Sequence, residues 1–172
     1  PEEQKAMVLS VLDMSVVRDL YRQLEQQAVT DSLTGLLNRR GFYQTVEGML
    51  LRNEHSGKYL VVLYLDLDGF KHVNDSLGHD AGDQVLQWVG EQLKDCLRPY
   101  DVLARMGGDE FVVVIDGLDF PEHAAKVAEK LIERVSARRH IDGIEATLGA
   151  SIGIAVYPDC GTNLDGLLRA AD

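Results

Sequence analysis

Residues 101–115 read "DVLARMGGDEFVVVI", in which two runs rich in β-branched and apolar residues flank a pair of glycines. Two such runs around a glycine turn predict a β-hairpin. Gly107 and Gly108 can take the positive φ angles of a tight turn, and without Cβ atoms they would let a phosphate approach the backbone. Asp109 and Glu110 follow at the start of the second strand, where adjacent carboxylates must face water, pair with cations or hold a metal.

The hydrophobic pattern around this hairpin predicts an α+β domain. A buried strand over 59–66 precedes a turn over 67–83 and a helix over 84–97. After the hairpin come a helix over 121–139, a β-rich run over 144–157 and a final helix. The order β-α-α-β-β-α-β is that of a ferredoxin-like fold, a mainly antiparallel central sheet flanked by helices, which we expect on one side of it.

The N-terminal residues differ from this pattern. Apolar residues recur every four positions within 2–28, which predicts a helix that extends the domain. The repeat drifts from a strict heptad, so a helix packed on its own domain and a connector from an upstream module are equally open. Turn formers in 30–42 end this helix, and another begins near Arg39. Because the chain starts at Pro1 and stops in apparent mid-helix at Asp172, we expect it to be a piece of a longer protein.

Composition and charge narrow the class of protein. With 172 residues and 45% hydrophobic content, the chain can form one domain with a core. Its 17 Lys and Arg against 28 Asp and Glu give a net charge of -11, which argues against binding to nucleic acid or to a membrane surface. Cys96 and Cys160 lack zinc or disulfide spacing, so we expect buried free thiols. The longest apolar run, 59–65, is too short to span a membrane and no signal peptide is present, which predicts a cytoplasmic location.

Two acidic pairs are expected at the ends of neighbouring strands. Asp66 and Asp68 leave the first strand on one face, because strand side chains alternate, and Asp109 and Glu110 lie in the hairpin turn. Carboxylates that converge repel one another, and a hard divalent cation relieves the repulsion. Oxygen ligands favour Mg²⁺ or Mn²⁺, through which an acidic protein could bind a nucleoside triphosphate. Solvated acids in a plain hairpin turn are the alternative.

Polar residues between these pairs extend the candidate site. They fall in the predicted turn and at the following helix start: Lys71, Asn74, His79 and Asp83. Asp83 could cap the helix, or it could accept the adjacent N–H donors of a guanine edge. Lys71 could be solvated or could contact a phosphate oxygen. The sequence contains no GxxxxGK[ST], HExxH or GxSxG, so it lacks the P-loop, metalloprotease and α/β-hydrolase signatures.

Several long motifs in fixed order resemble those of a known family. They are "DSLTGLLNRRGF" (31–42), "LDLDGFKHVNDSLGHDAGDQVL" (65–86), "RMGGDEF" (105–111) and "SIGIAVYP" (151–158). They closely resemble the GGDEF family, the diguanylate cyclases. The resemblance covers about residues 29–172 and leaves residues 1–28 as a linker or signalling helix. It implies a nucleotidyl-cyclase palm fold for this domain.

The resemblance implies an enzyme that condenses two GTP into cyclic di-GMP and releases two pyrophosphates, with a 3′-hydroxyl attacking the α-phosphate. Its catalytic positions match Asp109, Glu110 and Lys71. Its metal positions, for two Mg²⁺ or Mn²⁺ ions per active half-site, match Asp66, the Leu67 carbonyl, Asp109 and Glu110. Its GTP-binding positions match Lys71, Asn74, His79 and Asp83, with Asn74 and Asp83 on guanine, and the glycines that admit the triphosphate are Gly107 and Gly108.

The resemblance also implies assembly and regulation. Each domain holds one GTP, so two domains must face each other as a homodimer, and the N-terminal helix would join them to an upstream sensory domain. The run "RPYD" (98–101) matches an RxxD product-inhibition site, at which Arg98 and Asp101 would bind cyclic di-GMP. A surface ion pair is the alternative reading of these two residues.

Three functions stay open from the sequence. The family usually continues past "AAD" into a basic helix segment, and some motifs look most like GGDEF domains that precede a phosphodiesterase (EAL) domain. In such composites the domain is sometimes a GTP-binding regulator without cyclase activity. The candidates are therefore a cyclase, a catalytically silent GTP-binding module and a cyclic di-GMP receptor, and the intact acidic residues favour the cyclase.

Overall fold

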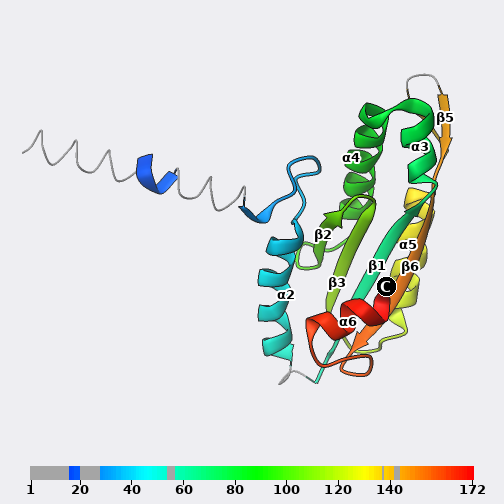
Figure 1. Cartoon of the computed structure of the whole chain (residues 1–172). Coiled ribbons are helices and arrows are strands. Elements are labelled where there is room, and N and C mark those ends of the chain that lie inside the picture. The colour runs from blue at the N-terminus through cyan, green and yellow to red at the C-terminus, as the bar shows by residue number, and fades with distance from the viewer. Residues whose placement is uncertain (1–15, 20–27, 54–56, 137, 142–143) are drawn as a thin grey trace, which may run out of the picture.

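The central feature of the fold is a four-stranded antiparallel sheet. The computed structural model describes residues 16–19, 28–53, 57–136, 138–141 and 144–172. Its elements are α2 (Arg39–Asn53), β1 (Tyr59–Asp68), α3 (Phe70–Leu77), α4 (His79–Cys96), β2 (Val102–Gly107), β3 (Glu110–Leu118), α5 (His123–Val135), β4 (Arg138–Ile141), β5 (Ile144–Thr147), β6 (Gly149–Tyr157) and α6 (Leu164–Ala171) (Figure 1). The strand order is β2-β3-β1-β6, and β4 pairs with β5 separately. The predicted α+β class, the hairpin and the helix near Arg39 are confirmed.

Helices cover both faces of the sheet, so the expectation of helices on one side is wrong. Alternate side chains of β1 enter two cores: Val61 and Leu63 pack with residues of α3, α4 and α5, whereas Leu60 and Val62 pack with residues of α2 and α6. In Figure 1, α6 crosses the near face of the sheet and α5 lies behind it. The run "YLVVLYL" carried this signal, because a strand buried on both faces is apolar throughout.

The stretch 67–83, predicted as a turn, is largely helical. β1 extends to Asp68, and α3 and α4 begin directly after Gly69 and Gly78, whose φ angles are 85° and 86°. These glycines mark the helix starts, because glycine takes a positive φ without the strain that a Cβ would cause. Most of the candidate residues in this stretch therefore lie on helices, which hold them more rigidly than a loop would.

The region after α5 also differs from the prediction. The helix expected over 121–139 ends at Val135, and the next described residues form the two short strands of the β4–β5 hairpin. The Asp-Gly dipeptide at 142–143 is a hairpin signal that the prediction overlooked. The β-rich run over 144–157 is divided at Leu148, a buried residue that separates β5 from β6 in the sequence.

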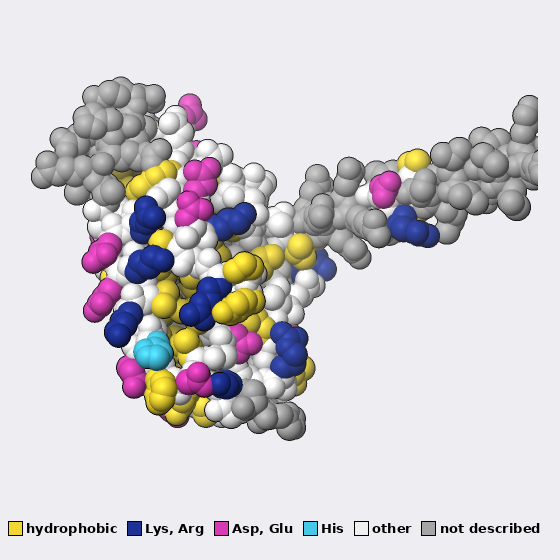
Figure 2. Space-filling view, turned by 180° about the vertical axis from the view of Figure 1, so that it is seen from behind, with side chains coloured by type: hydrophobic (Ala, Val, Ile, Leu, Met, Phe, Trp, Pro, Cys, Tyr) yellow, Lys and Arg dark blue, Asp and Glu magenta, His cyan; other side chains and the backbone are white. Residues whose placement is uncertain are grey.

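The side of α5 that faces solvent is charged. Charged side chains of both signs alternate on it, and they are Lys126, Glu129, Lys130 and Glu133. Figure 2 shows this face from behind, with basic and acidic side chains side by side over the yellow apolar layer. The opposite face of α5, with Ala124, Ala128 and Leu131, is buried against the core. This division is the amphipathic pattern of a helix packed on a sheet.

Two other predictions concern the N-terminus and the cysteines. Of the helix predicted over 2–28, residues 16–19 and 28 are described and are helical, and the rest of this prediction lies outside the described residues. Cys96 is half-buried, but Cys160 is exposed, so the expectation that both are buried is wrong for Cys160. Within the part of the chain that the structure describes, no helix has both the length and the apolar character needed to cross a membrane.

Candidate functional site

The tip of the β2–β3 hairpin has the open geometry that its glycines predict. Gly107 and Gly108 have φ angles of 146° and 53°, in the region that favours glycine. A Cβ added to either residue would meet no atom within 4 Å. Strand pairing is irregular between Arg105 and Gly107, where β2 turns toward the tip. The backbone here is accessible to a ligand from solvent.

Four carboxylates share one electrostatic environment beside this tip, and we call Asp66, Asp68, Asp109 and Glu110 the acidic cluster. Asp66 on β1 lies directly opposite Glu110 on β3 in the strand register. Partial burial, followed by the negative charges of Asp109, Asp68 and Glu110, raises the pKa of Asp66 above 3.8. The Asp66 side chain is largely exposed, so among these causes the neighbouring negative charges are the one that a bound cation would relieve. The structure thus brings the two predicted acidic pairs together.

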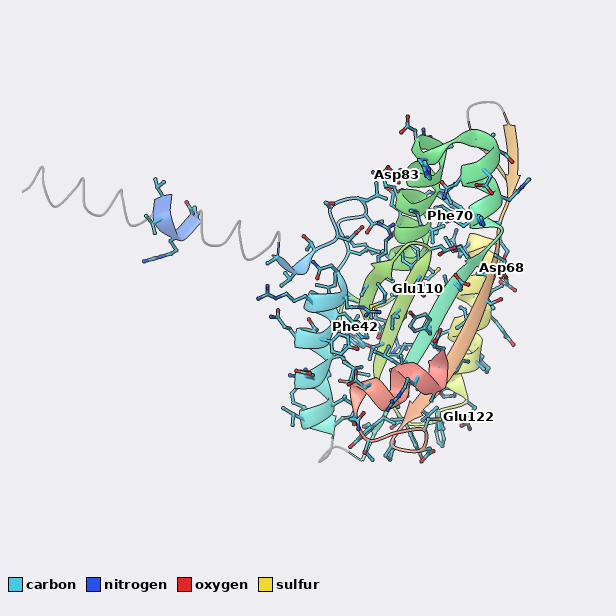
Figure 3. The ribbon with its side chains drawn as sticks, viewed as in Figure 1. Phe42, Asp68, Phe70, Asp83, Glu110 and Glu122 are labelled. Atoms are coloured by element: carbon cyan, nitrogen blue, oxygen red, sulfur yellow. The ribbon has the colours of Figure 1, made fainter. Side chains whose placement is uncertain are left out.

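Asp68 differs from the other members of the acidic cluster because it is tied to β6. Its Oδ2 accepts a hydrogen bond of 2.9 Å from the Ser151 hydroxyl. A Cβ at Gly149, the residue opposite Asp68, would lie only 3.2 Å from the Asp68 Cβ. In Figure 3, Asp68 and Glu110 lie at the end of the sheet nearer Asp83, and Glu122 lies toward the opposite end.

The donor chemistry of the cluster fits a hard cation. Among the described residues, no three or more His, Cys, Asp or Glu side chains are arranged to hold a metal by themselves. Mg²⁺ does not need such a cage, because it is usually bound by one or two carboxylates together with water and substrate phosphates. Asp66, Asp109 and the backbone carbonyl of Leu67 could supply that smaller set. The metal positions drawn from the resemblance therefore stay a prediction.

Tyr64 is a member of the site that the sequence analysis missed. It is half-buried on β1, two residues before Asp66 and on the same face. Burial, the hydrogen bond to Glu110 and the negative charge of Glu110 together raise the pKa of Tyr64 to about 12. The phenol therefore keeps its proton and can donate a hydrogen bond to the Glu110 carboxylate. Its position inside the apolar run "YLVVLYL" hid this role.

The remaining candidate residues gather where α3 meets α4. Lys71 is exposed in the first turn of α3, and Asn74 is half-buried further along the same helix. A Cβ at Gly82 would overlap the Asn74 amide oxygen, so this glycine permits the close contact between the helices. His79 is the first residue of α4, and Asp83 is exposed one turn later. The capping alternative for Asp83 is wrong, because α4 begins four residues before it.

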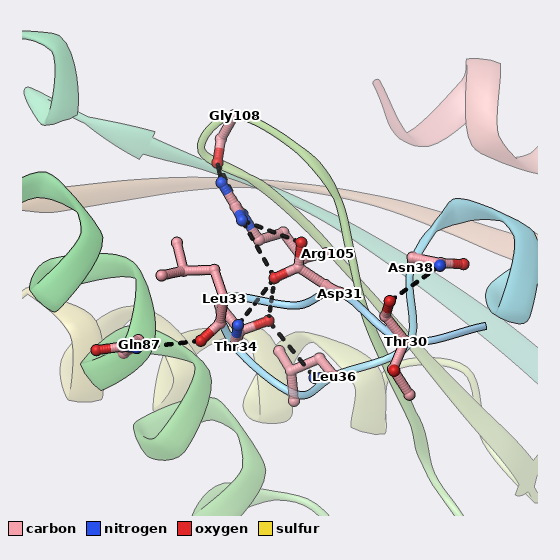
Figure 4. A network of polar contacts seen from close by, with 9 residues as sticks. All are labelled: Thr30, Asp31, Leu33, Thr34, Leu36, Asn38, Gln87, Arg105 and Gly108. Atoms are coloured by element: carbon pink, nitrogen blue, oxygen red, sulfur yellow. Dashed lines mark hydrogen bonds and ion pairs between the residues drawn. The ribbon is translucent and has the colours of Figure 1, made fainter. Parts of the chain in front are cut away.

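A second polar network, which we call the Arg105 network, comprises Asp31, Thr34, Arg105 and Gly108 (Figure 4). The Arg105 guanidinium donates to both Asp31 carboxylate oxygens at 3.1 and 3.2 Å, and Nε and Nη2 donate to the Gly108 carbonyl at 3.0 and 2.8 Å. Thr34 donates to the Asp31 Oδ1 from its backbone and its hydroxyl. The network thus ties the segment before α2 to the hairpin tip, a link that the sequence analysis did not predict.

The RxxD residues lie directly before the start of β2, whereas the hairpin acids Asp109 and Glu110 follow its end. The Arg98 guanidinium carbon lies 5.8 Å from the Tyr100 ring centroid, and the Arg98 backbone N–H donates to the Asp101 Oδ2 at 2.9 Å. Burial raises the pKa of Asp101, and its Oδ1 is buried without a hydrogen-bond partner. A pocket of about 520 Å³ is lined by Arg98, Tyr100 and a second arginine, Arg52 of α2. The guanidinium faces Tyr100, and its Nη1 donates to the Tyr100 hydroxyl at 3.0 Å. Among the described residues Arg98 forms no ion pair, contrary to the alternative reading of a surface ion pair.

An antiparallel sheet with a glycine hairpin and converging carboxylates at one end defines a domain of the nucleotidyl-cyclase palm type. The chain belongs to the family described as diguanylate cyclase, GGDEF domain, whose model matches residues 28–172. The family resemblance that the motifs carried is confirmed.

Known proteins similar to this chain include long signalling proteins. It is 42% identical to the bifunctional diguanylate cyclase/cyclic di-GMP phosphodiesterase MucR of Pseudomonas aeruginosa, over 95% of this chain and 24% of MucR. It is 40% identical to the diguanylate cyclase TpbB of the same organism, over 91% of this chain and 36% of TpbB. The chain therefore spans about a quarter to a third of these relatives.

The crystal structure of the coiled coil and GGDEF domain of DgcB from Caulobacter crescentus, in complex with c-di-GMP, is also similar. It superposes with a TM-score of 0.90 at 25% identity and covers 100% of this chain and 91% of the DgcB chain. This similarity agrees with the α+β fold described above.

Proposed function

We propose that this domain is a diguanylate cyclase, which condenses two GTP into cyclic di-GMP and releases two pyrophosphates. The observation that carries the proposal is the acidic cluster, in which burial and the neighbouring carboxylates raise the pKa of Asp66. Like charges held this close reduce stability, and such perturbed carboxylates are typical of sites where a cation or a reaction uses them. Membership of the GGDEF family supports the same reaction.

The roles follow from the chemistry of each side chain. Asp66, the Leu67 carbonyl, Asp109 and Glu110 would hold Mg²⁺ or Mn²⁺, two ions per active half-site. When bound, such ions neutralise the triphosphate and favour ionisation of the attacking 3′-hydroxyl. Asp109 and Glu110 would orient this hydroxyl, and Lys71 on α3 would stabilise charge on the reacting phosphates. The open space at Gly107 and Gly108 supports a triphosphate approaching the tip backbone.

Guanine recognition would fall to the junction of α3 and α4. The exposed carboxylate of Asp83 can accept two adjacent N–H donors of a guanine edge, a pattern that adenine does not offer. Asn74 and His79 would complete the substrate contacts from the same junction. Because each domain would hold one GTP, the reaction requires a homodimer in which the 3′-hydroxyl of one substrate faces the α-phosphate of the other.

The test is incubation of the protein with GTP and Mg²⁺, followed by measurement of pyrophosphate and cyclic di-GMP. We expect two pyrophosphates for each cyclic di-GMP, no product without divalent metal and no reaction with ATP. Nucleotide binding without product would favour the catalytically silent GTP-binding module, and binding of cyclic di-GMP alone would favour a receptor.

A second candidate function, binding of cyclic di-GMP as an inhibitor, is favoured by the geometry of Arg98 and Asp101. Arg98 and Tyr100 line one pocket together with Arg52, and Arg98 and Asp101 line a second pocket. A guanidinium can stack on guanine and pair with phosphate, and a carboxylate such as that of Asp101 can accept a guanine N–H.

We predict that Arg98→Ala leaves the initial cyclase rate unchanged and removes inhibition by added cyclic di-GMP, because the residue lies outside the acidic cluster. Progress curves with and without added product provide the measurement, and binding of radiolabelled cyclic di-GMP provides an independent one. Unaltered inhibition in the variant would contradict the assignment. Lys126→Ala, a change on the solvent side of α5, serves as the matched control.

The setting of the domain is also a proposal. Relatives such as MucR are several times longer than this chain, which supports an upstream sensory domain and a downstream EAL domain in the full protein. The free thiols and a cellular GTP substrate support a cytoplasmic location.

A further inference from the structure

Tyr64 lies on β1 between the buried part of the strand and its exposed, acidic end. On this face of the strand Leu60 and Val62 are fully buried, whereas Asp66 is exposed. The Tyr64 ring packs against the core that α2 and α6 share, and Glu110 is the carboxylate that, after burial, raises the pKa of the Tyr64 hydroxyl. One side chain thus joins the apolar core to the acidic cluster.

The strand register explains how Tyr64 reaches Glu110. Asp66 pairs with Glu110 and Tyr64 pairs with Val112, so Tyr64 and Glu110 are diagonal neighbours on one face of the sheet. Diagonal neighbours are within reach of an aromatic side chain. On its other side Tyr64 pairs with Gly153 of β6, where a Cβ would overlap the carbonyl of Ala171 in α6. The ring is therefore confined between packed elements.

We propose that Tyr64 is a positioning residue for the metal-binding carboxylates: its hydroxyl donates to Glu110 and holds this carboxylate toward Asp66. The inference rests on the proposed function, because it assumes that Glu110 acts on a divalent cation. An ionised carboxylate only accepts hydrogen bonds, so a fixed donor restricts its rotation and leaves the remaining lone pairs for a cation. Without the hydroxyl, Glu110 would have to be ordered each time a cation binds.

The chain offers a matched control in Tyr43 of α2. Tyr43 and Tyr64 line the same pocket, and the Tyr43 hydroxyl donates to the Asp165 Oδ1 at 2.9 Å, so Asp165 is to Tyr43 what Glu110 would be to Tyr64. Asp165 is an exposed residue of α6 and does not belong to the acidic cluster. Replacing either tyrosine with phenylalanine removes one hydroxyl and keeps the ring, so only the identity of the lost carboxylate partner differs.

The experiment compares the wild-type chain, Tyr64→Phe and Tyr43→Phe by titration with Mn²⁺, with and without GTP, followed by electron paramagnetic resonance. We expect Tyr64→Phe to weaken Mn²⁺ binding about 10-fold, as is typical for loss of a group that orients a ligand. In turnover assays we expect kcat to fall at fixed metal concentration while KM for GTP stays within about twofold, because guanine contacts are untouched. Tyr43→Phe should match the wild type in each measurement.

The outcomes separate this inference from the proposed function. Wild-type Mn²⁺ affinity in Tyr64→Phe, or equal weakening in Tyr43→Phe, overturns the role of Tyr64 even if the chain makes cyclic di-GMP. A wild-type chain that binds Mn²⁺ but makes no product refutes the cyclase, and the Mn²⁺ affinities still decide about Tyr64. A wild-type chain that binds no Mn²⁺ with or without GTP overturns the Tyr64 inference.

Discussion

Asp31 and the acidic cluster both lie near the β2–β3 hairpin, but the pKa values of Asp31 and Asp66 are shifted in opposite directions. Burial alone would raise the pKa of Asp31, but hydrogen bonds from Thr34 and the Arg105 guanidinium outweigh it and lower that pKa. In the acidic cluster, burial and three like charges raise the pKa of Asp66. The first carboxylate is fully compensated and stabilises the native state, whereas the second is left under repulsion.

The difference indicates that the residues that stabilise the hairpin are not the ones available for binding and catalysis. Arg105 connects the two groups, because its guanidinium binds Asp31 and also the carbonyl of Gly108, the residue before Asp109. The Arg105 network can therefore hold the tip in place while Asp66 stays under the repulsion of its neighbours and ready for a cation. Sites that violate local stability rules are commonly functional ones.

The largest expected effect concerns the acidic cluster. Asp109→Ala should lower the rate of cyclic di-GMP formation by at least ~10²-fold, because it removes one electrostatic catalytic group. The circular dichroism spectrum should not change, since Asp109 is a residue of an open turn. Asp119→Ala is the control, because this exposed carboxylate bonds to Lys58 away from the cluster and should leave the rate unaltered. Full activity of Asp109→Ala would remove the basis of the mechanism.

A smaller effect is expected when the hydrogen bonds that Arg105 donates to Asp31 and Gly108 are removed. Arg105→Met keeps the apolar stem but leaves Asp31 and the Gly108 carbonyl without their donor, which should cost about 1–3 kcal/mol of unfolding free energy. Urea denaturation measures this change. The side chains of Arg105 and Asp31 are only 13% and 21% exposed, whereas those of Lys58 and Asp119 are 45% and 65% exposed. Lys58→Met should therefore change stability much less, and equal losses would contradict the comparison.

The smallest expected effect is a gain of stability. Because its folded pKa is raised above 3.8, Asp66 destabilises the native state increasingly as pH rises through the interval above that value, and the cost persists at neutral pH. In metal-free buffer at pH 7, Asp66→Asn should raise Tm by about 1–2 °C, and at about pH 3.5 the gain should vanish.

Differential scanning calorimetry with added Mg²⁺ and GTP completes this test. Binding of the ligands to the native state should raise Tm of the wild type more than that of Asp66→Asn. A lower Tm for the variant in metal-free buffer at pH 7 would show that Asp66 stabilises the fold and would reverse the comparison.

Much of the fold could be predicted from local pattern. The hairpin follows from two β-rich runs around Gly107 and Gly108, and these glycines have the positive φ angles that were expected. Glycine also accounts for the main error, because the sequence pattern around Gly69 and Gly78 predicts a turn, whereas each of these glycines precedes a helix. A glycine indicates an unusual backbone angle, but it does not by itself distinguish a loop from a helix start.

The candidate site was predictable only where one residue type carries the chemistry. The pairing of Asp66 with the hairpin acids followed from strand alternation and the resemblance. Tyr64 and Arg105 could not be recognised, because each looks like an ordinary strand residue until its partner is known. Tyr64 acts on Glu110 through the β1–β3 register, and Arg105 reaches Asp31, 74 residues away in the sequence.

The sequence by itself determined the class of fold, the family and the identity of the acidic residues, because these depend on local hydrophobic period, turn residues and motif order. Only the tertiary structure decided which carboxylate is compensated and which is repelled, that helices cover both sheet faces, and which tyrosine supports Glu110. The reason is that pKa values and hydrogen-bond partners depend on distances between side chains, and strand register and helix packing set those distances across long stretches of chain.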